Sequence, residues 1–251
     1  MQMVVVDKVS LKFRMEKNRA DSLKEFFVRW VRRDLEAEEF WALDKVSFTA
    51  DRGDVVGIIG HNGAGKTTTL RCVAGILDFT EGTILIDGHD VRKEPVEAKR
   101  VTAFLPDNPD LYDFMTGIQY LKFVADMYRI PGDVRTKQIE RYAGIYKLTG
   151  ALGSSISAYS HGMKQKLALI SAFVRNPRFI ALDEPFVGLD PAAAFETKKL
   201  LRETCEAGGS VLFSTHVLEV AEKLCDRIAI IKNGVLVEEG ETEAIVGKES
   251  L

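Results

Sequence analysis

The stretch Gly60–Thr67, which reads Gly-His-Asn-Gly-Ala-Gly-Lys-Thr, constrains the fold of this chain more than any other part of its sequence. It has the spacing G-x-x-x-x-G-K-[ST], it follows an apolar run at 55–59, and a helical pattern of apolar residues follows it. Glycines here let successive backbone N–H groups turn toward an anion, and the N-terminus of the next helix adds partial positive charge. The stretch therefore predicts a phosphate-binding loop between a strand and a helix, with a glycine-rich turn that binds nothing as the alternative.

Two side chains of this loop have the chemistry that a bound nucleotide requires. Lys66 can reach the β- and γ-phosphates of a nucleoside triphosphate, and the hydroxyl of Thr67 can ligate Mg²⁺. The nucleotide-binding residues expected in this part of the chain are Gly60, His61, Asn62, Gly63, Ala64, Gly65, Lys66, Thr67 and Thr68.

The composition excludes several functional classes. With 251 residues and 46% hydrophobic content the chain can bury a large core, and we expect one domain with a subdomain. Lys and Arg number 34 against 37 for Asp and Glu, a net charge of -3, so a global nucleic-acid surface is not expected. The three cysteines are widely spaced in apolar surroundings, which predicts reduced thiols of a cytosolic protein and neither disulfides nor metal ligands.

The sequence predicts no membrane-spanning segment. No apolar run approaches the roughly 18 residues that a span needs, and the N-terminus lacks a signal-peptide pattern. Any membrane role is therefore expected to come through a partner or a surface helix.

One surface helix is predicted within region 14–39, where dense charge interrupts a strand pattern. The helix is expected at about 21–34, and its apolar stripe consists of Leu23, Phe26, Phe27, Trp30 and Val31. Four basic residues against one acid between 24 and 33 suit a membrane surface or a partner helix. An ordinary helix packed on its own domain is the alternative.

Apolar periodicity divides the chain into a β-rich part, a helical part and an alternating part. Strands are expected at 3–13, 40–49, 55–59, 83–86, 101–105, 179–182, 211–213, 227–231 and 235–237. Helices are expected from the phosphate loop through Leu77 and at 118–128, 134–146, 164–174, 193–205 and 217–224. We therefore expect an α/β fold of one domain, residues 1–251, with a parallel-sheet core, an antiparallel β subdomain and a helical subdomain at about 108–176.

The apolar stretch 179–182 ends in two acids, Asp183 and Glu184. A carboxylate at the tip of a parallel strand beside a phosphate loop can hold Mg²⁺, which is the role expected of Asp183. Glu184 would lie on the γ-phosphate side and polarise an attacking water. Paired acids are also common in turns, so this interpretation depends on the presence of Lys66 and Thr67.

The order of these motifs resembles the ATPase subunits of ATP-binding cassette (ABC) transporters, and the resemblance covers nearly the whole chain. Tyr159-Ser160-His161-Gly162-Met163 resembles the family signature Leu-Ser-Gly-Gly-Gln, with Ser160 and Gly162 in matching places at the start of a helix. In this family the signature of one subunit completes the nucleotide site of another, which implies a homodimer that closes on two ATP molecules. The resemblance thus implies a P-loop NTPase fold with ATP and Mg²⁺ as cofactors.

The resemblance also assigns roles near the γ-phosphate. Gly188-Leu189-Asp190 resembles the loop that communicates between the two sites, and Ser214-Thr215-His216 resembles the switch region, in which the histidine contacts the γ-phosphate. A lone histidine after a strand is otherwise more often structural. The expected catalytic residues are Glu184, His216 and Lys66.

Two further assignments depart from the family pattern or leave a choice. Asp107 stands where the family usually has a glutamine that senses Mg²⁺, and an acid there can still ligate the metal. Phe13 is the expected adenine-stacking aromatic, with Tyr159 and Trp41 as other candidates. The expected metal ligands are Thr67, Asp183 and Asp107.

The resemblance implies an enzyme that hydrolyses ATP on the cytoplasmic face of the membrane and drives export through integral membrane subunits. Residues 22–27 and 39–43 resemble exporters of polysaccharides, O antigen or teichoic acid, whereas 105–107 and 162–166 are more similar to exporters of peptides or drugs. No carbohydrate-binding extension is expected, because the chain ends at Leu251. The rival hypotheses are a soluble cassette ATPase that acts on ribosomes or DNA, and a regulatory nucleotide-binding module without turnover; we expect no nucleic-acid partner.

Overall fold

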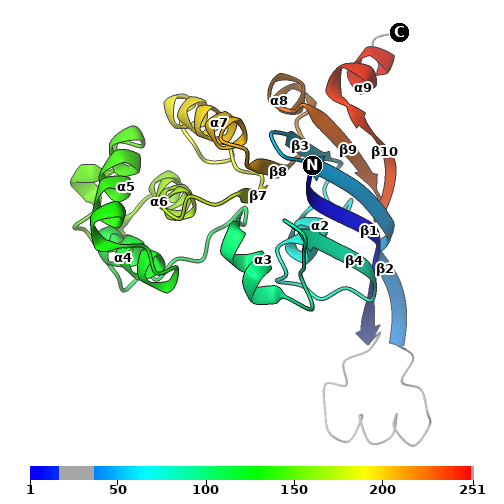
Figure 1. Cartoon of the computed structure of the whole chain (residues 1–251), viewed down its shortest axis with the longest axis horizontal. Helices are drawn as coiled ribbons and strands as arrows, with labels where there is room; N and C mark the ends of the chain where they lie inside the picture. The colour runs from blue at the N-terminus through cyan, green and yellow to red at the C-terminus, as the bar shows by residue number, and fades with distance from the viewer. Residues whose placement is uncertain (17–36, 250–251) are drawn as a thin grey trace, which may run out of the picture.

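The computed structural model describes residues 1–16 and 37–249, which form two sheets surrounded by helices (Figure 1). The four-stranded sheet and the paired strands that extend from it lie at one end of the molecule, and helices α4, α5 and α6 gather at the other (Figure 1). The predicted amphipathic helix at about 21–34 lies outside the described residues.

The smaller sheet is antiparallel and has the strand order β2-β1-β4-β5. β1 lies between two partners, since Val5 is opposite Thr49 on one side and Leu85 on the other. Val4 and Val6 are both buried, which is the period of two expected of a strand with one face on the core. The strands are β1 (Gln2–Glu16), β2 (Ala37–Asp51), β4 (Glu81–Ile86) and β5 (His89–Asp90).

The larger sheet has six strands in the order β10-β9-β3-β8-β7-β6, and every neighbouring pair except β10–β9 is parallel. The predicted parallel sheet is therefore confirmed. Its central strands are buried on both faces, which is why they are continuous apolar runs in the sequence. The strands are β3 (Val55–Ile59), β6 (Thr102–Leu105), β7 (Phe179–Asp183), β8 (Ser210–Thr215), β9 (Arg227–Lys232) and β10 (Val235–Glu241).

The helices follow the predicted order, with three differences. α3 and α9 are additional helices of seven and eight residues, which are too short to show a clear helical period. α2 ends at Val73 and does not continue through Leu77, because Gly75 adopts a left-handed backbone that ends the helix. The helices are α2 (Lys66–Val73), α3 (Pro95–Val101), α4 (Gly117–Met127), α5 (Gly132–Ile145), α6 (His161–Phe173), α7 (Pro191–Glu206), α8 (Leu218–Leu224) and α9 (Thr242–Glu249), with 3-10 turns at Thr149–Ala151 and Ile156–Ala158.

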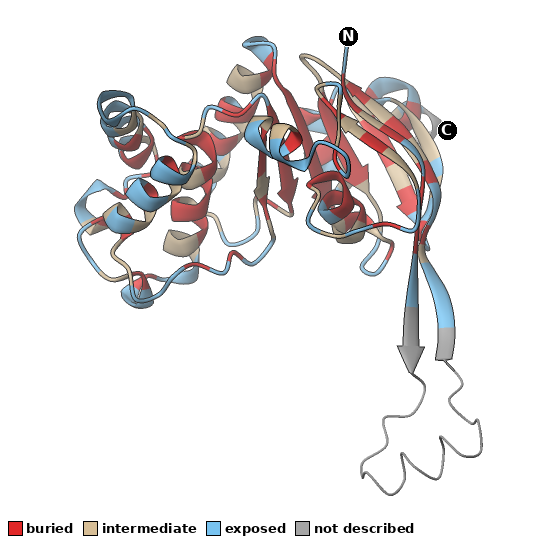
Figure 2. Cartoon of the chain, turned by 60° about the horizontal axis from the view of Figure 1, so that its bottom comes forward, coloured by how far each residue is buried: buried red, intermediate tan, exposed pale blue. Residues whose placement is uncertain are grey.

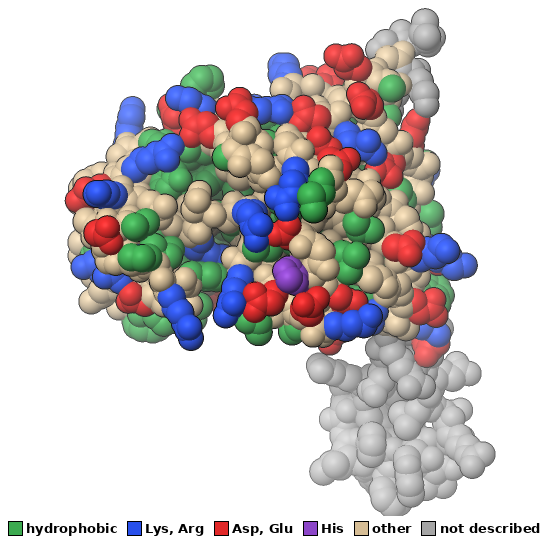
Figure 3. All heavy atoms as spheres, viewed as in Figure 1, with side chains coloured by type: hydrophobic (Ala, Val, Ile, Leu, Met, Phe, Trp, Pro, Cys, Tyr) green, Lys and Arg blue, Asp and Glu red, His purple; other side chains and the backbone are tan. Residues whose placement is uncertain are grey.

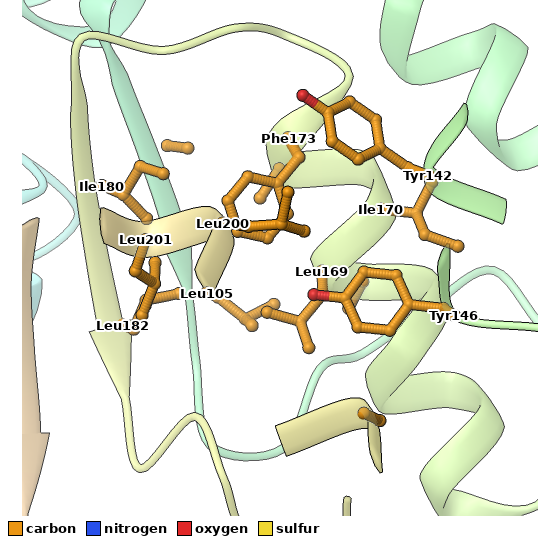
Figure 4. Close-up of a cluster of buried hydrophobic side chains, with 14 of the residues drawn as sticks. Leu105, Tyr142, Tyr146, Leu169, Ile170, Phe173, Ile180, Leu182, Leu200 and Leu201 are labelled. Carbon is orange, nitrogen blue, oxygen red and sulfur yellow. The ribbon is translucent and has the colours of Figure 1, made fainter. Parts of the chain in front are cut away.

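Two buried apolar clusters hold these layers together. One joins the antiparallel sheet and α2 to one face of the larger sheet, and the other joins α4, α5, α6 and α7 to its opposite face (Figure 2). Full burial of each Leu, Ile or Phe contributes roughly 1.5–3 kcal/mol. The second cluster includes the side chains labelled in Figure 4, which come from α5 and its C-cap, α6, α7 and the strands β6 and β7: Leu105, Tyr142, Tyr146, Leu169, Ile170, Phe173, Ile180, Leu182, Leu200 and Leu201.

Charged side chains of both signs lie on the surface (Figure 3), and the three cysteines are buried. Acidic and basic side chains are interspersed over the face shown in Figure 3. Cys72, Cys205 and Cys225 are buried free thiols, and burial raises the pKa of each to about 12. Across residues 1–16 and 37–249, no helix combines the length and the apolar character needed to cross a membrane.

Candidate functional site

The phosphate loop joins β3 to α2 and is shaped by glycine. Gly65 is the N-cap of α2 with φ +111°, a left-handed conformation that favours glycine and leaves no side chain over the helix end. A Cβ on Gly60 would lie 2.3 Å from the carbonyl oxygen of Ile231, so only glycine fits against β9 there. The first N–H groups of α2 therefore face an open concavity, which suits an anion.

Lys66 crosses the inside of this loop. Its side chain is 7% exposed, and Nζ donates hydrogen bonds to the carbonyl oxygens of Gly60 at 2.8 Å and His61 at 3.3 Å. Its remaining neighbour is Oε1 of Glu184 at 3.8 Å. A buried ammonium held by two neutral carbonyls retains the capacity to bind a phosphate oxygen.

The two acids lie beside the loop because three strands end at the same level. Ile59 of β3 is paired with Thr215 of β8, and Ser214 is paired with Asp183 of β7. Asp183 is 2% exposed and accepts a hydrogen bond from the Ser214 hydroxyl at 2.5 Å. A single strand register thus brings the acidic strand end to the phosphate loop.

Glu184 leaves the line of β7 with φ +46°, a left-handed conformation that costs a non-glycine residue about 1–2 kcal/mol. This turn sends its side chain toward the loop, where it is 14% exposed. Oε1 lies 2.8 Å from Nδ1 of His216, which follows β8. Glu184 is therefore within reach of both Lys66 and His216, although the three residues come from separate segments.

A cavity of about 650 Å³ is lined by Lys66 and Glu184 but not by His216, and its size fits a small-molecule ligand. The phosphate loop and the acids line one part of it, and aromatic residues of β1 and β2 line another. Phe13 and Phe40 have ring centroids 5.7 Å apart, and Trp41 stands beside them. The cavity is lined by Phe13, Phe40, Trp41, Ala42, Asn62, Gly63, Ala64, Gly65, Lys66, Thr67, Thr68, Arg71, Pro106, Asp107, Asn108, Asp183, Glu184, Asn233 and Gly234.

The three residues expected to hold Mg²⁺, Thr67, Asp183 and Asp107, all line this cavity. Within the described residues, no three His, Cys, Asp or Glu side chains cluster so that they could hold a metal ion. Mg²⁺ commonly uses one or two carboxylates and completes its octahedron with phosphate oxygens and water. The side chains present fit that ion bound together with a nucleotide.

Tyr159 is not an aromatic wall of the cavity, which corrects one of the three candidates for adenine stacking. Its ring is 6% exposed within the helical part, and its hydroxyl donates to the carbonyl oxygen of Ala151 at 2.7 Å. Phe13 and Trp41 line the cavity, and Phe40 joins them. The aromatic pair at 40–41 in a predicted strand was the signal available for Phe40.

The signature residues pack elsewhere, on the loop at 188–190 of the same chain. Ser160 is the N-cap of α6, and its hydroxyl accepts a hydrogen bond from the N–H of Met163 at 3.3 Å. A Cβ on Gly162 would lie 2.9 Å from the carbonyl oxygen of Gly188. Among the described residues that line the cavity, none belongs to the signature stretch 159–163.

Asn233 and Gly234 are among the residues of the cavity wall that were not predicted to have a site role. They were expected only as a hairpin turn, yet the turn lies against the loop. Gly234 donates its N–H to the carbonyl oxygen of Ala64 and accepts from the N–H of Asp44, both at 2.8 Å. A turn reaches a site in this way only through strand order, which no local pattern contains.

Comparison with known proteins decides the family. The sequence profile of one family, described as ABC transporter, matches residues 43–187, more than half of the chain. This chain belongs to the ABC transporter family. The matched range begins in β2 and includes the phosphate loop, the signature stretch, Asp183 and Glu184.

Curated relatives of this ABC transporter chain include two proteins of Bacillus subtilis. The uncharacterized ABC transporter ATP-binding protein YhcH is 37% identical over 78% of the chain and 64% of its own length. The ABC-type transporter ATP-binding protein EcsA is 35% identical over 76% of the chain and 78% of its own length. The chain thus spans less than two thirds of the length of YhcH.

Solved structures confirm the predicted P-loop fold of an ABC ATPase. One described as the ATP-binding subunit of an ABC transporter superposes with a TM-score of 0.84 at 29% identity, covering 99% of this chain and 94% of that one. Another is an ATP-binding cassette described as a dimer in a post-hydrolysis state bound to ADP and Pi. It superposes with a TM-score of 0.79 at 23% identity, covering 96% of this chain and 99% of that one. At this identity the comparison shows a shared fold and nothing more.

Proposed function

We propose that this chain is the ATP-binding and ATP-hydrolysing subunit of a bacterial ABC transporter that exports its cargo. The observation that carries this proposal is the meeting of Lys66, Asp183 and Glu184 at one phosphate loop in a cavity with an aromatic wall, with His216 in contact with Glu184. A loop that only bound phosphate would need neither the strained Glu184 nor the histidine behind it.

The residues divide the chemistry among them. The N–H groups of the loop and Nζ of Lys66 bind the phosphate chain and stabilise negative charge on the transferring group. Glu184 orients the attacking water and takes its proton, and His216, 2.8 Å from Oε1, holds that carboxylate and meets the γ-phosphate. Thr67, Asp183 and Asp107 would hold Mg²⁺, which would supply further positive charge to the phosphates. Phe13, with Trp41 and Phe40, stacks on the adenine.

The site is completed by a second copy of the chain. Ser160 and Gly162 have the hydroxyl and backbone N–H groups that bind phosphate, but they are not among the described residues that line this chain's cavity. We therefore place the signature of one subunit over the nucleotide of the other, as a closed homodimer with twofold symmetry. The dimeric relative described above supports this arrangement.

Integral membrane subunits are the second partner, and the chain is a peripheral protein of the cytoplasmic face with no nucleic-acid partner. Support comes from an exposed aromatic cluster formed by the segment before α4 and by α4 itself. Phe114 is 81% exposed, and the ring centroids of Phe114 and Phe123 each lie 5.7 Å from that of Tyr112. Exposed aromatic clusters of this kind are typical of protein interaction surfaces.

The cargo is proposed to be a polysaccharide or glycolipid, because residues 22–27 and 39–43 resemble such exporters; a peptide or drug is the alternative. Reconstitution with the membrane subunits, scored by substrate-stimulated ATP hydrolysis, separates the two. Phe114→Ser should lower the stimulation and the copurification of membrane subunits but not basal hydrolysis. Val237→Ser, at a 62% exposed site on β10, is the matched control.

Subunit complementation tests the shared site. Lys66→Ala damages the loop half and Ser160→Ala damages the signature half, so each homodimer should be inactive. In a mixed dimer both lesions fall in one site and the other site is intact. Random mixing should therefore restore roughly a quarter of the wild-type hydrolysis, counting half of the dimers as mixed with one working site each.

Two outcomes contradict the proposal in different ways. Absence of hydrolysis in the wild-type chain with Mg²⁺ and ATP would refute the ATPase assignment. Active wild type with no recovery in the mixture, although mixed dimers are present by affinity-tag copurification, would show that each chain completes its own site. ATP binding by the Ser160→Ala monomer should stay close to wild type, since this residue belongs to the other subunit's site.

A further inference from the structure

Ser214 lies at the junction of the two acids and has no assigned role. It is on β8 directly opposite Asp183 in the parallel register, and it is 0% exposed. Ser214 is not one of the described residues that line the cavity, so its side chain lies beneath the cavity wall.

The hydroxyl of Ser214 makes two hydrogen bonds whose direction is fixed by chemistry. It donates its one hydrogen to the carboxylate oxygen Oδ1 of Asp183 at 2.5 Å. It accepts from the backbone N–H of Glu184 at 3.1 Å, because an amide N–H can only donate. One oxygen atom therefore bridges the side chain of the first acid and the backbone of the second.

Each bond fixes a feature that hydrolysis would use. The bond to Asp183 restricts the rotation of its carboxylate and leaves the second oxygen for the metal. The bond to Glu184 anchors the peptide at which the chain enters the left-handed conformation, φ +46°. Such a conformation persists only where surrounding contacts hold it, and it is this turn that directs Oε1 toward His216.

We propose that Ser214 is a positioning residue that aligns the Mg²⁺ ligand Asp183 and the water-activating Glu184 with each other. The proposal rests on the ATPase function proposed above. Ser214 acts through the two acids and touches neither nucleotide nor metal. Its loss should therefore slow turnover far more than it weakens the binding of ATP, which depends on the phosphate loop and Lys66.

The same strand offers a matched control. Ser210, at the opposite end of β8, is also 0% exposed, and its hydroxyl donates to the carbonyl oxygen of Asp54 at 3.1 Å. Ser210→Ala and Ser214→Ala each remove one buried hydroxyl from one strand, so a general loss of packing affects both. Only Ser214→Ala uncouples the acids.

The experiment compares kcat and KM for ATP in wild type, Ser210→Ala and Ser214→Ala, with ATP binding in EDTA measured in parallel. Ser214→Ala should lower kcat about 10- to 100-fold, the effect of losing a buried hydrogen bond to a charged group. Its KM and its affinity for ATP in EDTA should stay within about threefold, because the contacts of the loop remain. Ser210→Ala should keep kcat within about twofold, as expected for a change away from the site.

The possible outcomes distinguish a failure of the positioning role from a failure of the proposed ATPase function. Equal kcat in Ser214→Ala and Ser210→Ala, with active wild type, overturns the positioning role alone. A parallel loss of ATP binding in EDTA also overturns it, because the effect would then be general. An inactive wild type overturns both proposals. If Ser214→Ala does not fold, Ser214→Cys, which keeps only a weak donor, should show the same loss of kcat, and wild-type kcat in folded Ser214→Cys overturns the role.

Discussion

The hydrogen bond between Tyr146 and Thr197 predicts an asymmetry between two conservative substitutions. Tyr146, the C-cap of α5, is 1% exposed, and its hydroxyl lies 2.9 Å from Oγ1 of Thr197 in α7. Oγ1 also lies 2.8 Å from the carbonyl oxygen of Ala193, which can only accept. The hydroxyl of Thr197 therefore donates its one hydrogen to the carbonyl oxygen of Ala193. In the hydrogen bond between the two hydroxyls, Tyr146 is the donor and Thr197 is the acceptor.

The direction of that bond sets the size of each effect. Tyr146→Phe removes the donor and leaves Thr197 bonded to Ala193, so it should cost about 1 kcal/mol of unfolding free energy. Thr197→Val leaves the O–H of Tyr146 buried without an acceptor, which should cost about 1–3 kcal/mol. Because burial raises the pKa of Tyr146, the donor stays protonated at any working pH. The double variant should cost less than the sum, since it leaves no unpaired donor.

Urea unfolding followed by circular dichroism measures the three free energies, with equal m-values as the check that the unfolded states are comparable. Thermal melts should give shifts of about 2–4 °C per kcal/mol for a chain of this size. A larger cost for Tyr146→Phe than for Thr197→Val would mean that the donor was assigned the wrong way round. Additive costs would mean that the two hydroxyls do not interact.

Three further predictions concern the site and the cysteines. Lys66→Ala should weaken ATP binding about 10- to 100-fold by removing a charged donor, measured by titration with a fluorescent ATP analogue; undiminished affinity would count against the loop. Glu184→Gln should keep ATP binding and lower turnover about 10²- to 10⁴-fold, and substantial residual hydrolysis would exclude Glu184 as the main base. Burial raises the pKa of Cys72, Cys205 and Cys225 from 9.0 to about 12, so their contribution to stability should be complete below pH 9 and fall as pH rises toward 12. Native protein at pH 8 should resist a thiol reagent that labels all three in urea.

The sequence predicts the parallel core well because the core leaves strong local patterns. Strands with both faces buried are continuous apolar runs, and the loop at Gly60–Thr67 needs both its glycines and its flanking elements. α3 and α9 were not predicted because helices of seven and eight residues are too short to show a clear helical period. The end of α2 depends on one left-handed glycine, Gly75, which an apolar pattern continuing to Leu77 conceals.

The composition of the site is less accessible to sequence because it depends on strand order. Asp183 and Ser214 are separated by 31 positions, and they meet only because β7 and β8 are neighbours in register. Tyr159 shows how a local pattern can suggest a contact that the fold does not make. An aromatic residue beside the signature suggests a ligand contact, but its hydroxyl donates a hydrogen bond to the carbonyl oxygen of Ala151 inside the helical part. The family resemblance predicted the roles of the motifs, whereas the structure was needed to show which aromatic residues line the cavity.

The backbone of Gly234 connects the two parts of the cavity wall, the phosphate loop and the aromatic residues. It bonds the phosphate loop at Ala64 on one side and the aromatic-bearing strand β2 at Asp44 on the other, and a Cβ there would lie 2.5 Å from the carbonyl oxygen of Ala42. The wall that would face a base and the cradle that would hold phosphates are thus joined by backbone alone. Side-chain substitutions around the cavity should therefore leave the distance between the aromatic wall and the phosphate loop unchanged, because the link between them contains no side chain.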